Sequence, residues 1–173
     1  MSRFFPHAAY AEDQPLAKTI LTTHVLTRAF QTGSLVGTGV GVSLLTLRRF
    51  NVLSPRISPL PAYLTILRSS GTGAVIALGI LSVGLPIRMS GREAIEWQDR
   101  SWRLRGNKGQ TELDDWTYAG MAAAAAAVAS KGKGLGWRGA VGGIGAGSVV
   151  GILSYMGWRY GVKGGKFEED DTP

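Results

Sequence analysis

The chain has 173 residues, of which 45% are hydrophobic, and its formal net charge is +7. A chain of this length is expected to form one domain. The sequence contains no cysteine, which excludes a disulfide framework, thiolate chemistry and cysteine-ligated zinc or iron–sulfur sites.

Residues 1–28 are expected to form an amphipathic N-terminal segment. Asp13 is followed by Gln14 and Pro15, an acidic cap with a proline in the first turn, which predicts a helix start at this point. No Gly or Pro follows until Gly33. We therefore expect this helix to run directly into the first membrane helix.

Four stretches without a charged residue predict four transmembrane helices. A helix of about 20 residues spans the ~30 Å hydrocarbon core of a bilayer, and the alternative, a buried helix in a soluble protein, is seldom so long and uncharged. The third stretch is short and rich in alanine, so we expect the other helices to shelter it. The predicted segments are helices at about 29–47, 69–87 (ending near Pro86), 113–130 and 139–158, a polar loop at 88–112 and an acidic C-terminal tail at 159–173, with disorder expected from Phe167 onward.

Glycines recur at every fourth position in the first and last of these helices, which places each set on one helix face. In water each Gly costs a helix up to about 1 kcal/mol relative to Ala, whereas in a membrane a glycine face lets a second backbone approach closely. The sequence thus predicts an all-α integral membrane protein with glycine-mediated helix packing. The expected packing residues are Gly33, Gly37, Gly41, Gly139, Gly143, Gly147 and Gly151.

The polar loop is predicted to contain a short amphipathic helix at the membrane interface, with its two tryptophans at headgroup depth. A plain solvated connector is the alternative. The two aspartates that follow are expected at the start of the third membrane helix, where acids favour the helix dipole. The candidate partner-interface residues are Trp97, Asp99, Arg100, Trp102, Arg103, Asp114, Asp115 and Trp116.

The net charge comes from two short loops. Segments 48–68 and 131–138 contain seven Lys or Arg and no acid, a pattern typical of headgroup anchors. We therefore expect phospholipid, with cardiolipin as a candidate, and no nucleic acid among the partners. The acid-free loops favour the matrix or cytoplasmic side, although the other side carries more cations. The expected headgroup residues are Arg48, Arg49, Lys131, Lys133 and Arg138.

No motif for chemistry stands out. His7 and His24 have no second ligand at metal-binding spacing. The glycines of 134–139 fit G-x-G-x-x-G but follow a basic hairpin rather than a strand, so dinucleotide binding is not expected. We expect no catalytic, cofactor-binding or metal-binding residues and no enzymatic activity.

Four short helices, glycine-rich first and last helices and a charged central loop are similar to the mitochondrial inner-membrane translocase family and its relative in respiratory complex I. The loop signature of that family pairs an Arg with an Asp four residues later. The nearest match here is Arg92 with Glu96, and the glycines expected downstream are missing.

The loop 96–104, Glu-Trp-Gln-Asp-Arg-Ser-Trp-Arg-Leu, together with 107–110 and 114–116, more closely resembles fungal accessory membrane subunits of NADH:ubiquinone oxidoreductase, the NUXM type. This resemblance implies a multi-pass protein of the mitochondrial inner membrane. It also implies a supporting, non-redox role in the membrane arm of complex I, with other membrane subunits as partners. The alternative is a subunit of an inner-membrane preprotein or metabolite translocase.

Overall fold

The computed structural model describes residues 4–52, 60–131 and 134–167, and all regular elements in these ranges are helical. The all-α expectation is therefore confirmed. The elements are η1 (Ala11–Asp13), α1 (Ala17–Arg49), α2 (Ala62–Met89), α3 (Ala94–Gly106), α4 (Lys108–Lys131), α5 (Gly136–Met156) and the π-helical turn η3 (Gly157–Val162).

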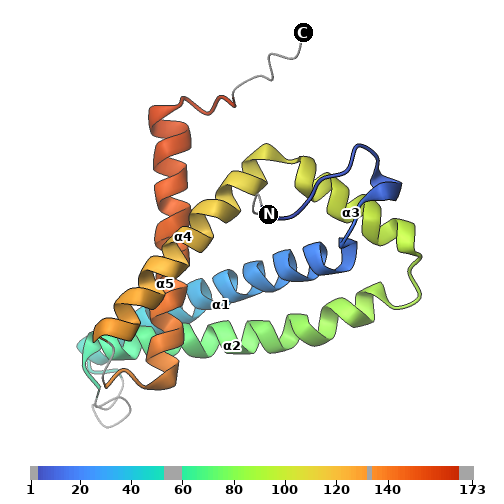
Figure 1. Cartoon of the computed structure of the whole chain (residues 1–173). Coiled ribbons are helices and arrows are strands. Elements are labelled where there is room, and N and C mark those ends of the chain that lie inside the picture. The colour runs from blue at the N-terminus through green and yellow to red at the C-terminus, as the bar shows by residue number, and fades with distance from the viewer. Residues whose placement is uncertain (1–3, 53–59, 132–133, 168–173) are drawn as a thin grey trace.

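The helices form two antiparallel pairs that meet at one end of the molecule. Helices α1 and α2 run side by side, and α4 packs on α5 (Figure 1). Helix α5 also crosses α2 and α1 near the C-terminal end of α1, and the pairs diverge from this crossing. Helix α3 joins the end of α2 to the start of α4 and lies beside the start of α1.

The interior is made of small and polar residues, whereas large apolar side chains face outward. The largest fully buried residues are Ile20, Thr117, Asp114, Ser34, Ser70, Ser101 and Ser148. By contrast, Val36, Ile80 and Leu153 are each more than half exposed. A soluble protein buries its large aliphatic residues, whereas membrane helices meet through small residues and turn apolar side chains toward lipid.

Three helical segments are long and apolar enough to cross a membrane: Ala17–Arg49, Ala62–Met89 and Gly136–Val162. They contain the first, second and fourth of the predicted spans. The third predicted span lies in α4, whose run of alanines is a strong helix former but only weakly apolar, and α4 is not among the three.

Glycine positions coincide with the closest approaches between helices. A Cβ added at Gly33 would overlap the carbonyl oxygen of Gly73 on α2, and one at Gly37 would overlap that of Ser69. Gly41 faces Ile66 in the same seam. Along the α1–α2 interface the two backbones therefore touch directly at these glycines, with no side chain between them.

Helix α5 has glycines on two faces. Gly143, Gly147 and Gly151 face α4, where a Cβ would meet Val128, Ala124 and the carbonyl oxygen of Trp116. Gly142 and Gly145 face the other way and contact Leu67 of α2 and Ser34 of α1. The four-residue spacing in the sequence pointed to the first face alone; the second face is an additional finding. Gly139 lies against Leu135 and the stem of Arg68.

Two expected helix ends are wrong. Asp13 does not cap α1; it closes the short η1, and α1 begins at Ala17 after Leu16, which adopts a left-handed conformation with φ 55°. The second helix does not stop at Pro86 but continues to Met89. A proline so near a C-terminus removes a single backbone hydrogen bond, so the last turn can still form. The acidic residues 168–171 of the expected tail lie outside the described residues.

Candidate functional site

A buried polar cluster connects α1 to α4. Asp114 is fully buried, and its carboxylate accepts hydrogen bonds from Arg28 and, at 3.3 Å, from the side chain of Gln110. His24 Nδ1 lies 3.4 Å from the second carboxylate oxygen. The charge of Asp114 is therefore balanced by a guanidinium from another helix, the arrangement that a buried ion needs.

The cluster extends through Gln31 to α5. Arg28 donates to Gln31 Oε1 at 2.6 Å, and Gln31 Nε2 donates to Thr117 Oγ1 at 3.2 Å and to the Ser148 carbonyl oxygen at 3.5 Å. The oxygen of the Gln31 amide therefore bonds within α1, and its nitrogen bonds to α4 and α5. A lone amide in a stretch without charges was the one sign of this role in the sequence.

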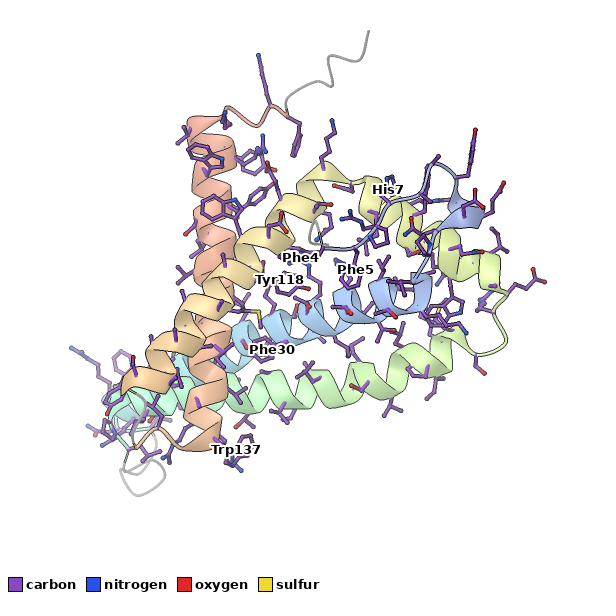
Figure 2. All side chains as sticks on the ribbon, viewed as in Figure 1. Phe4, Phe5, His7, Phe30, Tyr118 and Trp137 are labelled. Carbon is purple, nitrogen blue, oxygen red and sulfur yellow. The ribbon has the colours of Figure 1, made fainter. Side chains whose placement is uncertain are left out.

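A second contact between α1 and α4 lies beside the first and joins Thr27 to Tyr118. Thr27 donates to its own helix at the Thr23 carbonyl oxygen, 2.8 Å away, and lies 2.9 Å from the Tyr118 hydroxyl. A threonine has one hydroxyl proton, so Tyr118 is the donor to Thr27. Figure 2 shows Tyr118 pointing from α4 toward α1. We name the set Arg28, Gln31, Asp114 and Thr117 the polar cluster. Its members form hydrogen bonds with one another, and these bonds join α1 to α4.

The N-terminal segment lies along α3 and is held there by Trp102. The Trp102 indole N–H donates to the Ala8 carbonyl oxygen at 3.0 Å, and its ring stacks on His7 at 5.7 Å between centroids. Gln98 donates to the Glu12 carbonyl oxygen at 2.7 Å. These contacts are intramolecular, so Trp102 binds a segment of its own chain at the place where we expected a partner.

Gln14 folds the same segment into a loop. Its side-chain oxygen accepts from the Ala8 N–H at 3.2 Å, and its amide donates to the carbonyl oxygens of Pro6 and Pro15 at 3.0 and 3.2 Å. The Gln14 side chain is almost fully buried by these contacts. A glutamine amide thus orders the segment in front of α1, where the sequence had suggested an aspartate cap.

Trp102→Ala is expected to release residues 6–16 from α3. The substitution removes a hydrogen bond and a ring contact, together worth about 2 kcal/mol, so hydrogen exchange in this segment should become 10- to 30-fold faster, by order of magnitude. Trp137→Ala removes an exposed tryptophan at the other end of the molecule and is the matched control. Unchanged exchange in Trp102→Ala would contradict the docking of this segment.

Glu112 near the start of α4 contacts Arg159, which follows the end of α5. Arg159 forms an ion pair with Glu112 and donates to the Lys166 carbonyl oxygen, and its guanidinium stacks on Phe167 at 4.2 Å. The nearby Arg105 sits outside the spanning helices, where burial lowers its pKa and the charge of Asp115 partly offsets that effect. The Arg159–Glu112 pair holds the chain after α5 against the start of α4.

The other predicted interface residues divide into paired and exposed groups. Within α3, Asp99 and Arg103 form an exposed ion pair at 2.9 Å, and Arg100 lies 3.8 Å from Glu96. Lys18 of α1 stands over the Trp97 ring at 5.8 Å.

The predicted interface residues of α4 lie in different surroundings. Trp116 remains on the surface, whereas Asp114 is inside. Asp114 and Asp115 also lie nearly two turns into α4, because Asn107 caps this helix by accepting the Gln110 N–H at 2.9 Å.

The predicted headgroup residues gather where α1 ends and α5 begins. Arg49 is exposed and Arg48 half-buried at the last turn of α1, and exposed Arg138 lies in the first turn of α5 beside the Trp137 ring, at 5.3 Å. Figure 2 shows Trp137 pointing away from the bundle. The side chain of Lys131 and all of Lys133 lie outside the described residues.

An all-helical chain with three candidate membrane spans, a small and polar interior and an apolar exterior is a membrane protein. Within residues 4–52, 60–131 and 134–167, no three His, Asp or Glu side chains lie close enough together to hold a metal ion. Residues 7–154 match the family described as "Protein of unknown function (DUF1757)", and the chain belongs to this family. No curated protein matches the sequence.

Proposed function

We propose that this protein is a non-catalytic accessory subunit of the membrane arm of mitochondrial complex I, in which it stabilises larger membrane subunits. It resides in the mitochondrial inner membrane with four transmembrane helices, which are α1, α2 and α5 together with α4. Glycine-mediated packing holds the four together. The resemblance of the loop 96–104 supports the assignment to complex I.

The observation that carries the structural role is that the polar cluster inside the bundle joins the chain's own helices to one another. Arg28 and Asp114 neutralise each other, and Gln31 bonds to α4 and α5. What the bundle offers to other molecules is its apolar exterior. Such a surface suits packing against membrane subunits and lipid.

The apolar exterior is broad on the three long helices. It includes Leu35 and Val36 on α1, Ile80 and Val83 on α2, and Leu153 on α5, each more than half exposed. Contiguous apolar surface of this kind marks protein or membrane contacts. We propose that some of these faces contact neighbouring subunits and that the remainder faces acyl chains.

The test is to tag the full chain in its native cells, solubilise membranes in mild detergent and identify the proteins that co-purify. Complex I membrane subunits are the expected partners. Depletion should reduce assembled complex I on native gels and lower NADH oxidation, while succinate oxidation is unchanged as the internal control. Intact complex I after depletion would overturn the proposal.

A translocase subunit is the second candidate, favoured by one contact. Arg92 and Glu96 form an ion pair at 3.3 Å at the start of α3, at the place where the translocase signature pairs Arg with Asp. This candidate predicts translocase components in the same purification and an import or flux defect with NADH oxidation intact. One experiment therefore separates the two functions.

A further inference from the structure

The described carboxylates all lie at one end of the molecule. The acidic residues of the chain fall in segments 12–13, 93–115 and 168–171, and the first two segments lie in η1, in and just before α3 and in the first turns of α4, away from the end where α1 stops and α5 begins (Figure 1). The opposite end carries Arg48, Arg49, Arg68 and Arg138. The segments that carry them, 48–52, 60–72 and 134–142, contain no acidic residue.

Two of these arginines are brought together by a close backbone contact between α2 and α5. Gly71 lies directly against the carbonyl oxygen of Arg138, so the first turn of α5 packs one helical turn from Arg68. A pocket of about 300 Å³ is formed there by Arg68, Arg138 and the backbone turn from Leu135 to Trp137. Exposed Trp137 at the rim is the residue type enriched at the headgroup level of membranes.

The same two arginines also line a long apolar groove. The groove, of about 630 Å³, follows the α1–α2 seam and is lined by Val36, Val40, Thr65, Ile76 and Ile80 as well as by Arg68 and Arg138. From Arg68 to Ile80 it extends ~18 Å along α2, more than the ~15 Å depth of one leaflet of hydrocarbon. None of its lining residues is acidic.

We propose that this end of the protein binds one anionic phospholipid, with the phosphate held by Arg68 and Arg138 and an acyl chain in the α1–α2 groove. Guanidinium groups form strong charge-assisted hydrogen bonds with phosphate. The apolar groove and the cationic pocket join at the two arginines, which matches a molecule with a charged head and a long apolar tail. The site does not depend on which larger complex contains the protein.

A second cavity at the acidic end is less suited to a phospholipid. It is lined by Glu112, which forms an ion pair with Arg159, and by five cations, namely Arg105, Lys108, Arg159, Lys163 and Lys166. None of the residues that line it belongs to the α1–α2 groove. This cavity could attract an anion but offers no long apolar groove for an acyl chain, so the end with Arg68 and Arg138 is the one that suits a whole phospholipid.

The test uses the full chain purified in a neutral mild detergent, with its melting temperature measured as lipid is added. Phosphatidylglycerol should raise the melting temperature, and native mass spectrometry should detect one retained lipid. Phosphatidylcholine with the same acyl chains should bind at least about tenfold more weakly, and inorganic phosphate at the same concentration should give no shift. An equal shift with phosphatidylcholine or with phosphate alone would overturn the proposal.

Variants locate the two parts of the site. Arg68→Gln and Arg138→Gln should each weaken phosphatidylglycerol binding about tenfold, equivalent to ~1.4 kcal/mol, and Arg68→Lys should retain more binding than Arg68→Gln. Arg49→Gln removes an exposed cation at the same end that lines neither cavity, and it should bind like the unmodified protein. Equal weakening by Arg49→Gln would mean that binding depends only on the overall positive charge of this end, and it would refute a specific site at Arg68 and Arg138.

The groove is tested separately from the arginines. Val40→Trp places a large ring in the groove and should weaken lipid binding while leaving the unliganded melting temperature near its original value, because Val40 is half exposed. Val75→Trp alters a partly exposed valine of α2 that does not line the groove, and it should bind normally. Normal binding by Val40→Trp would overturn the placement of the acyl chain.

Discussion

Asp114→Ala is expected to destabilise the folded chain by about 3 kcal/mol, because it leaves the Arg28 guanidinium without its carboxylate between the helices. The lower end of the usual range applies, since the Arg28 side chain keeps 24% of its surface exposed. The measurement is the free energy of unfolding from a reversible denaturant titration in mixed micelles. A loss below about 0.5 kcal/mol, the size of a surface pair, would contradict the structural role of the cluster.

Asp99→Ala is the matched control, because Asp99 also pairs with an arginine but does so on the surface of α3, where Arg103 is 73% exposed. Its expected cost is at most about 0.5 kcal/mol. Adding Arg28→Met to Asp114→Ala should recover part of the lost stability, because no unpaired charge then remains. A double variant that is less stable than Asp114→Ala alone would show that Arg28 acts independently of Asp114.

Gly37→Ala is expected to destabilise the protein by about 2–3 kcal/mol, the cost of inserting a methyl group into a closely packed interface. The added Cβ would overlap the Ser69 carbonyl oxygen, and that atom is backbone and cannot rotate away. Helices α1 and α2 would have to separate. The same micelle titration measures the loss, and a cysteine-free chain permits cross-linking between introduced cysteines as a direct readout of helix separation.

Gly39→Ala provides a control in the same helix, two residues away. A Cβ at Gly39 would meet no atom within 4 Å, so the substitution should be neutral or stabilise α1 by up to about 1 kcal/mol. Equal effects of Gly37→Ala and Gly39→Ala would mean that helix propensity, and not contact with α2, determines the result.

The long helices were predictable because length and charge-free composition leave little alternative to a membrane span. The glycine spacing was informative for α1, where one repeat faces one partner. On α5 it was incomplete, because a helix with neighbours on two sides needs small residues on both, and Gly142 and Gly145 interrupt a simple four-residue repeat. Helix ends were less accessible: the start of α1 depends on the amide of Gln14, whose partners are set by how the preceding residues fold back.

The polar cluster could not be read from the sequence for a different reason. Arg28 and Asp114 each border an apolar stretch, and a charge at such a position is normally taken as a headgroup anchor. Their pairing requires α1 and α4 to lie next to each other in a register that sequence distance does not reveal. A glutamine in an otherwise apolar helix, as at Gln31, was the one signal available, since a lone amide in that setting needs partners.

The two-faced helix α5 determines the order in which the bundle can assemble during synthesis. The α1–α2 hairpin contains its own glycine seam, so it can close as soon as residue 89 has entered the membrane. Helix α4 finds its main packing surface on α5, which is made later. Between these two events the Asp114–Arg28 pair is a contact that already links α4 to the hairpin. The last helix to be translated completes the bundle.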